Sequence, residues 1–329
     1  MAIPKLILFA LSLIYGSIVR LAIFFYRIKP CRLKCKVISI GNITLGGTGK
    51  TPLVELVAGY LRKNGRTPAI LTRGYKRRSR LQMGDEPAML QRKLVNIPVI
   101  VGADRISGAK QAMQNYAADT VILDDGFQQW RIKKDLEIVA IDARNPFGNL
   151  HMLPRGILRE PLSSLKRADI FVLTKADSAG AAVNSILHRL NPDALIVQVV
   201  YSPVSFYELG KDDVAIGPGV LKGKTVSLFC GIADPESFKN TVAGLGINIG
   251  LFFGFPDHYY YTKGDLESII ARSKEKGIDT IVTTEKDAAR LCELGQNIRV
   301  LRMLALRVEL KIAENEEKFY GRLLSLYSL

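Results

Sequence analysis

The sequence predicts an α/β fold in which a mostly parallel sheet is flanked by helices, with a second, smaller α/β domain and a membrane-associated helix at the N-terminus. Three observations lead to this prediction. A short apolar stretch runs into a glycine-rich turn and a helix at residues 36–64, and a second apolar stretch ends in two acids at 120–125. Further strand-like and helix-like stretches then alternate along the chain, which predicts parallel strands joined by covering helices.

The composition limits the classes of partner. The chain has 329 residues, 48% of them hydrophobic, so it can bury a sizeable core in one large domain or two modest ones. Lys and Arg total 46 against 31 Asp and Glu, a formal net charge of +15. This excess predicts an anionic partner, which could be a nucleic acid, an anionic membrane or a phosphorylated substrate. The four cysteines lack zinc-finger spacing, which predicts reduced thiols in a cytosolic compartment.

The first segment, residues 6–26, is mostly apolar and carries no charge apart from Arg20. A membrane-spanning helix needs about 20 apolar residues, and the long side chain of Arg20 could reach the interface. Residues 27–36 then carry five basic side chains and no acid. This order predicts a membrane-associated helix over residues 1–30, either inserted or lying flat, with its basic end at anionic headgroups. A helix buried in the core is the alternative.

Residues 36–52 combine a short strand, a glycine-rich turn and the start of a helix, which are the parts of a phosphate-binding P-loop. Glycines let successive backbone N–H groups point at an anion, and the N-terminus of the helix predicted from Leu53 favours the same charge. Lys50 adds a positive charge for the terminal phosphates, and the Thr51 hydroxyl is placed to bind Mg²⁺. The residues expected to bind a nucleoside triphosphate are Thr44, Leu45, Gly46, Gly47, Thr48, Gly49, Lys50 and Thr51.

The second strong signal is the apolar strand that ends in Asp124 and Asp125. An acid at the end of such a strand is the Walker B arrangement, which places a carboxylate beside the Mg²⁺ of the P-loop. Asp124 is the expected ligand, with Asp125 next to it. The P-loop NTPase-like sheet is expected to contain further strands at residues 67–72, 136–142 and 169–174, and a helix opens at Asp104–Arg105.

Two charged loops are candidates for ligand contact. Residues 73–80 hold five basic residues directly after a predicted strand, where ligands of open α/β sheets usually bind. Residues 151–162 form a long loop with closely spaced charges, Gly and Pro, typical of lids and substrate loops. The alternative for both is an ordinary solvated loop.

The helix–strand rhythm lapses around residues 202–218, and a second α/β segment follows. Its strands are expected at 225–230, 249–253, 280–283 and 298–301, and its helices at 236–245, 263–276 and 286–292. Thr262 and Asp265 form an N-cap signature for the middle helix. His258, one of three histidines, is a catalytic candidate, although a lone histidine is usually structural. A final helix over 312–326 is expected to return to the first domain.

Several motifs together resemble one family, the tetraacyldisaccharide 4′-kinases of lipid A biosynthesis. The motifs are Gly41–Asn42, Gly46–Pro52, Arg73–Tyr75, Gly84–Pro87, Asp124–Gln128, Leu153–Gly156, Leu158–Leu162, Phe255–His258 and Thr284–Ala288. The family's P-loop also begins with a residue other than glycine, as Thr44 does here. Where the family often has a second histidine, this chain has Tyr259, which leaves His258 as the candidate there.

The resemblance implies a membrane-associated kinase that transfers the γ-phosphate of ATP to the 4′-hydroxyl of a tetraacyl disaccharide 1-phosphate. The reaction would take place at the cytoplasmic face of the bacterial inner membrane. It also implies the domain organisation. Residues 31–200 would form the kinase domain, with 311–329 packing back on it. Residues 201–218 and 303–310 would form a two-stranded linker, with strands at 201–209 and 305–310, and residues 219–302 the smaller α/β domain.

The resemblance also implies roles for single residues, with ATP and Mg²⁺ as the cofactors. Thr51, Asp124 and Glu160 would organise Mg²⁺, directly or through water. Asp85 would receive the proton of the sugar hydroxyl, and His258 would orient Asp85 as its domain closes over the substrate. The candidates for contact with substrate or anion are Arg73, Arg105, Asp125 and Arg159.

A membrane-recruited ATPase or GTPase switch is the main alternative. The P-loop resembles the deviant loop of partitioning ATPases, although Leu45 stands where that loop has Lys, and Thr174–Asp177 resembles a guanine-reading element. A nucleic-acid-binding NTPase is a second alternative, but the chain shows no aromatic-basic stacking motif. We therefore expect a lipid disaccharide and an anionic membrane surface as partners, without a nucleic acid or a protein partner.

Overall fold

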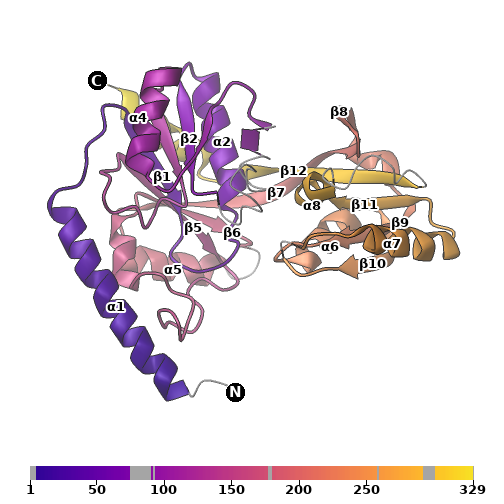
Figure 1. Ribbon diagram of the computed structural model, residues 1–329, viewed down its shortest axis with the longest axis horizontal. Helices are drawn as coiled ribbons and strands as arrows, with labels where there is room; N and C mark the ends of the chain where they lie inside the picture. The colour runs from indigo at the N-terminus through magenta and orange to yellow at the C-terminus, as the bar shows by residue number, and fades with distance from the viewer. Residues whose placement is uncertain are drawn as a thin grey trace. The chain divides into compact units, whose positions relative to one another are not determined.

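The computed structural model describes residues 5–74, 90–91, 93–176, 180–257, 259–291 and 301–328 of the chain. The chain divides into two compact units, Met1–Val200 with Leu310–Leu329, and Tyr201–Glu309 (Figure 1). The long strands β7 (Leu195–Glu208) and β12 (Arg302–Glu314) contribute residues to both units. The predicted fold class, a mostly parallel sheet flanked by helices, is confirmed. The predicted limits of the domains and of the linker stay a prediction.

The first unit contains a parallel sheet with the strand order β7-β6-β5-β1-β4-β2-β3. Besides β7 its strands are β1 (Lys36–Gly41), β2 (Pro68–Thr72), β3 (Val99–Val101), β4 (Thr120–Asp124), β5 (Leu136–Asp142) and β6 (Ile170–Thr174). Strands β2, β4 and β6 are buried throughout, as expected for a parallel sheet covered on both faces. In the register of β1 with β4, Ile40 is paired with Asp124. The turns that follow these two strands therefore begin side by side.

Strand β3 was not predicted, because three residues are too few to give a recognisable pattern. The helices of this unit are α2 (Lys50–Lys63), α4 (Arg105–Tyr116), α5 (Gly180–Leu190) and α9 (Glu316–Leu324), with 3-10 helices at Leu162–Arg167 and Ser325–Tyr327. α2 begins at Lys50, earlier than predicted, since Gly49 in the left-handed region is already its N-cap. α9 contacts α2, where Tyr320 stacks on Tyr60 with ring centroids 4.0 Å apart.

The predicted helix over 312–326 is wrong at its start. Residues 312–314 extend strand β12, and Asn315 with φ 61 separates this strand from α9. A left-handed residue breaks the run of hydrogen bonds that either element needs, and asparagine adopts this conformation more readily than most residues. The apolar residues of the stretch had suggested one continuous helix, although part of them belong to a strand with alternating burial.

α1 (Lys5–Ile28) is the one helix in the described part of the chain that is long and apolar enough to cross a membrane. It lies along the first unit, drawn in indigo in Figure 1. Only 17% of its apolar stretch is buried in the protein, which excludes the alternative of a core helix. Its exposed apolar side chains include Leu6, Ile7, Leu11, Leu13, Ile14, Ile18, Leu21, Phe24, Phe25 and Ile28.

The second unit has the strand order β10-β9-β11-β12, in which neighbouring strands pair in parallel, while β8 pairs antiparallel with β7. Its other elements are β8 (Lys211–Ile216), β9 (Thr225–Cys230), β10 (Asn248–Gly254), β11 (Thr280–Thr284), α6 (Pro235–Gly244), α7 (Lys263–Glu275), α8 (Glu285–Leu291) and a 3-10 helix at Pro218–Leu221. The predicted cap of α7 is confirmed as a capping box between Thr262 and Asp265. The strand predicted at 298–301 lies almost wholly outside the described residues, and β12 begins at Arg302.

Candidate active site

The turn between β1 and α2 has the backbone of an anion-binding loop. Gly46 (φ 117) and Gly49 (φ 78) adopt positive φ angles at which a side chain would be strained. No side chain caps α2, and a Cβ built on Gly46 would meet no atom within 4 Å. In the described part of the chain, the buried Thr48 hydroxyl has no hydrogen-bond partner. Uncapped helix N–H groups, an unpaired hydroxyl and open space beside a glycine fit a bound phosphate group.

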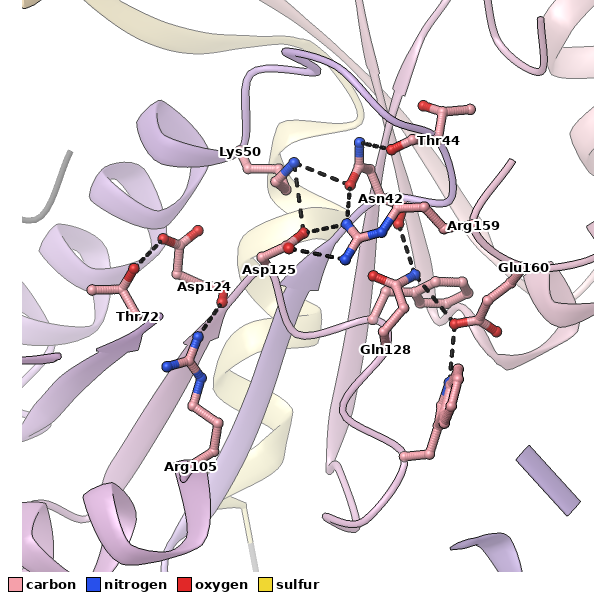
Figure 2. Close-up of polar contacts among 12 residues, drawn as sticks. Asn42, Thr44, Lys50, Thr72, Arg105, Asp124, Asp125, Gln128, Arg159 and Glu160 are labelled. Atoms are coloured by element: carbon pink, nitrogen blue, oxygen red, sulfur yellow. Dashed lines mark hydrogen bonds and ion pairs between the residues drawn. The ribbon is translucent and has the colours of Figure 1, made fainter. Parts of the chain in front are cut away.

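Three charged side chains and one amide gather beside this loop (Figure 2). Lys50 Nζ donates to Asn42 Oδ1 at 3.0 Å and lies 3.6 Å from Asp125 Oδ1. Arg159 donates from both terminal nitrogens to the Asp125 carboxylate, at 2.8 and 3.1 Å, and reaches Asn42 Oδ1 at 3.4 Å. The structure thus brings together three of the charged residues named from the sequence. Asn42, which joins both cations, was noted only as part of a family motif.

The Asp125 carboxylate is directed back toward the P-loop by an unusual turn after β4. Asp125 has φ 54, and a Cβ on the following Gly126 would lie 2.6 Å from Ser39 Oγ and 2.7 Å from Leu123 Cβ. Only glycine therefore fits at position 126. Burial acts to raise the pKa of Asp125, but the hydrogen bonds from Arg159 and the charge of Lys50 outweigh it and lower that pKa. Asp125 is therefore ionised at neutral pH.

The two expected Mg²⁺ ligands nearest the P-loop are both buried. Thr51 and Asp124 are each 5% exposed, and Asp124 Oδ2 accepts a hydrogen bond from Thr72 Oγ1 at 2.9 Å. Among the described residues no three His, Cys, Asp or Glu side chains form a metal-binding group. Mg²⁺ in phosphate sites commonly takes one or two carboxylates and completes its shell with phosphate oxygens and waters. The Thr51 hydroxyl at the start of α2 and the Asp124 carboxylate at the end of β4 are groups of the kind that meet this requirement.

Glu160 occupies a different environment from the one expected of a metal ligand. Its carboxylate is fully buried and accepts hydrogen bonds from Gln128 Nε2 (3.2 Å), Trp130 Nε1 (3.0 Å) and Arg167 Nη2 (2.9 Å). Figure 2 shows it beside Gln128, whereas Asp124 lies beside Thr72. The structure therefore does not bring Glu160 into one group with Asp124. Its role as a metal ligand stays a prediction.

A buried ionic cluster continues inward from Glu160. Arg167 also lies 3.7 Å from Glu137, and Glu137 forms an ion pair with Lys134 and accepts a hydrogen bond from Ser39 at 2.9 Å. Burial raises the pKa of Glu137 and lowers the pKa of Lys134, with the opposite charge of each partner counteracting the effect. No sequence signal pointed to this cluster, since its members are spread over different strands and turns.

The two remaining arginine candidates have different surroundings. Arg105, 4% exposed, donates to the carbonyl oxygens of Gly102 and, at 3.3 Å, of Asp124. Burial lowers its pKa, and the nearby aspartates oppose that change. Arg73 follows β2 directly and is exposed. A direct contact of either arginine with an anion stays a prediction.

The long loop at 151–162 pairs with the P-loop. Arg159 N donates to Ile43 O, and Leu45 N donates to Ile157 O, each at 2.8 Å. Leu158 between them forms an antiparallel bridge with Thr44. The backbone of the loop therefore fixes where the Arg159 side chain begins relative to the P-loop.

Asp85 and His258 lie outside the described residues, so the acid–base pair is not placed. The residues around His258 are described in part. Tyr261 Oη and Gly231 N donate to Asp287 Oδ1 at 3.0 and 3.1 Å, and Arg290 Nη1 donates to the same atom at 2.9 Å. These buried contacts hold the segment that follows His258 against β9 and α8.

The guanine-reading interpretation of Thr174–Asp177 gains no support. Asp177 lies outside the described residues. Lys175, at the end of β6, donates to Asp142 Oδ2 at 2.9 Å, and Thr174 Oγ1 donates to Ile141 O at 3.3 Å. These contacts tie β6 to β5, as an ordinary strand end does.

Comparison with known proteins gives a consistent result. The family model described as Tetraacyldisaccharide-1-P 4'-kinase matches residues 4–327. A protein named Tetraacyldisaccharide 4'-kinase from Halothermothrix orenii is 34% identical, over 93% of this chain and 90% of its own length. One of the same name from Syntrophus aciditrophicus is 38% identical, over 81% of this chain and 78% of its own.

Among solved structures, one described as an "apo" form of LpxK from Aquifex aeolicus in complex with ATP superimposes with a TM-score of 0.75 at 28% identity. The match covers 97% of this chain and 98% of that one. The motifs, the P-loop geometry and these matches along nearly the whole sequence agree, and the chain belongs to the tetraacyldisaccharide-1-P 4'-kinase family.

Proposed function

We propose that this chain is an ATP-dependent kinase that transfers the γ-phosphate of ATP to the 4′-hydroxyl of a tetraacyl disaccharide 1-phosphate in lipid A biosynthesis. The observation that carries the proposal is the cluster of Lys50, Asn42, Asp125 and Arg159 beside the P-loop, in a chain of the 4′-kinase family. The ATP named in the description of the similar solved structure supports the choice of nucleotide. The alternative, a nucleotide-dependent switch, is not favoured by the family to which the chain belongs.

The P-loop residues 44–51 would bind the triphosphate. Backbone N–H groups at the start of α2 and the Thr48 hydroxyl would donate to phosphate oxygens, which satisfies the donors that lack partners among the described residues. Lys50 and Arg159 would turn from Asp125 toward the phosphates, because a triphosphate carries more negative charge than one carboxylate. These two cations would then stabilise the charge on the phosphoryl group in flight.

Thr51 and Asp124 would hold Mg²⁺, whose chemistry is to neutralise phosphate charge and fix the geometry of the triphosphate. The hydrogen bond from Thr72 to Asp124 would orient that carboxylate. Glu160, implied as a further ligand by the family resemblance, would have to give up hydrogen bonds from Gln128, Trp130 or Arg167 to act directly. A role through water or through the position of its loop is therefore the form of that proposal that the contacts support.

On the acceptor side, Asp85 would receive the proton of the sugar hydroxyl, and His258 would orient and tune Asp85. The basic excess of the chain would serve two anions, the bilayer surface and the 1-phosphate of the substrate. The exposed apolar face of α1 would associate with the cytoplasmic face of the inner membrane, which keeps the acyl chains in the bilayer.

The test is transfer of ³²P from ATP to purified tetraacyl disaccharide 1-phosphate by the full-length protein, with the product identified by mass. We expect incorporation at the 4′-position that depends on the acceptor and prefers ATP over GTP. Asp85→Asn should abolish turnover at saturating substrates while nucleotide binding is retained. Hydrolysis of GTP or ATP without transfer to the lipid would contradict the proposal and favour the switch.

A further inference from the structure

Helix α1 has a second face, which packs on the protein instead of facing outward. The residues of this face recur at helical spacing and are Phe9, Ser12, Tyr15, Gly16, Val19 and Ile23. Val19 is 6% exposed and belongs to the same core cluster as Phe127 and Leu158. A Cβ on Gly16 would lie 3.2 Å from Met152 Sδ, so the helix and the protein approach closely there. α1 is therefore an integral part of the first unit.

Two hydroxyl groups on this face bond to the backbone of a single loop. Ser12 Oγ donates to Met152 O at 2.8 Å, and Tyr15 Oη donates to Arg159 O at 3.1 Å. The guanidinium of Arg155 lies over the Phe9 ring, 4.7 Å from its centroid. A hydroxyl on an otherwise apolar helix is costly to bury unless it is hydrogen-bonded, so these contacts favour one seating of α1 on the loop.

The other side of the same loop contacts the P-loop. The Arg159 backbone is held twice, because its N–H donates to Ile43 O at 2.8 Å while its carbonyl accepts from Tyr15. Its side chain forms the paired hydrogen bonds to Asp125. A continuous path of hydrogen bonds therefore runs from α1, through one residue of the loop, to the phosphate-binding cluster.

We propose that Tyr15 and Ser12 are positioning residues for phosphoryl transfer. Through the loop at 152–159 they would hold Arg159 in register with the P-loop, so that the helix with the exposed apolar face also sets the geometry of the phosphate site. The proposal rests on the kinase function proposed above. It predicts that a change in how α1 packs on the first unit also changes turnover. Turnover should fall even when the exposed apolar face of the helix is left unchanged.

The experiment uses the full-length protein with Tyr15→Phe, Ser12→Ala and the double variant. α1 supplies matched controls. Ser17 is exposed and its hydroxyl donates to Leu13 O within the helix. Ser17→Ala therefore removes a serine hydroxyl, as Ser12→Ala does, but breaks no contact with the loop. Tyr26→Phe removes a phenol oxygen but keeps the ring that stacks on Trp130. Each variant is assayed for kcat, for KM of ATP and of lipid, for Tm and for sedimentation with anionic vesicles.

We expect Tyr15→Phe to lower kcat about tenfold, with a larger effect in the double variant, because small misplacements of a phosphate contact have large effects on rate. KM for the lipid and sedimentation with vesicles should stay at wild-type values, and both controls should turn over as wild type. In an Arg159→Lys background Tyr15→Phe should have little further effect, since Tyr15 acts through Arg159. If Tyr15→Phe does not fold, the kcat of Ser12→Ala, which loses the contact with the other end of the loop, tests the proposal instead.

The inference is overturned if Tyr15→Phe and the double variant keep wild-type kcat, if the controls lose as much, or if the effects of Tyr15→Phe and Arg159→Lys on kcat multiply independently. Failure of the kinase proposal looks different. In that case the wild-type protein itself transfers no phosphate to the disaccharide.

Discussion

Arg159 and Glu160 are neighbours in the sequence but belong to two charged clusters that differ in their access to water. Arg159 joins Lys50 and Asp125, whose side chains are 22%, 18% and 38% exposed. Glu160 joins Arg167, Glu137 and Lys134, with side chains that are 0%, 15%, 8% and 8% exposed. Both clusters contain two cations and one or two carboxylates. They differ in access to water, and this difference assigns them different roles.

Charged groups that water can reach exchange partners at little cost, because solvent screens them in either arrangement. A phosphate can therefore replace Asp125 beside Lys50 and Arg159. Groups inside the protein have no such freedom, since removal of one partner leaves an uncompensated buried charge. We therefore propose that the cluster around Glu160 fixes the loop that carries Arg159, and that the cluster around Asp125 binds phosphate. Three predictions test this comparison.

The largest effect is expected from Lys50→Ala. Lys50 lies at the start of α2 and contacts Asn42 and Asp125 in the more accessible cluster, so its loss removes the proposed phosphate contact without opening the core. We expect kcat for phosphoryl transfer to fall about 10²–10³-fold, as for other electrostatic contacts to a developing charge. Tm should change little, because the side chain reaches solvent. A large drop in Tm together with the loss of activity would show that the more accessible cluster also stabilises the fold.

Glu160→Ala should act mainly on stability. Arg167 and the Trp130 N–H would lose their buried acceptor, and breaking a buried ion pair costs about 3–5 kcal/mol. Urea unfolding measures this loss, and Glu160→Gln, which keeps one acceptor oxygen, should lose less. If Glu160→Gln were as stable as wild type but needed much more Mg²⁺ for half-maximal activity, Glu160 would be a metal ligand and the comparison of the two clusters would fail.

The smallest effect is a pH dependence at Asp125. Its pKa is lower in the folded protein than in the unfolded chain, so its ion pairs stabilise the fold above the unfolded pKa of about 3.9. That contribution is lost as the pH falls through the lower, folded pKa. The Tm of wild type should therefore exceed that of Asp125→Asn by a few degrees near pH 6 and converge with it toward pH 3. A difference that stays constant over this range would mean that the charge of Asp125 does not stabilise the fold.

The phosphate site could be predicted largely from the sequence. Gly46, Gly49 and Lys50 are adjacent along the chain, and their conformations follow from local steric rules. The meeting of the P-loop with Asp124 and Asp125 follows as well, because the carboxyl ends of parallel strands lie at the same edge of a sheet and β1 pairs directly with β4. For this region, the local sequence pattern and the pairing of parallel strands are enough to predict which residues meet.

The role of Glu160 could not be predicted in the same way. The resemblance implied a metal ligand, while the structure surrounds its carboxylate with Gln128, Trp130 and Arg167. Their side chains lie on two different segments, and nothing in their spacing indicates that they converge. The start of the C-terminal helix was predicted wrongly for a related reason, since Ile312 and Ala313 fit a helix or a strand equally well until their partner is known.

The sequence by itself determined the α/β class, the P-loop, the acidic strand end and an N-terminal helix with a large apolar surface, because each is encoded by residues close together in the chain. Only the tertiary structure decided which face of α1 packs on the protein and where Glu160 points. The hydrogen bond from Tyr15 to Arg159 joins positions 144 residues apart. Such a contact depends on how the whole unit packs, and no local pattern contains that information.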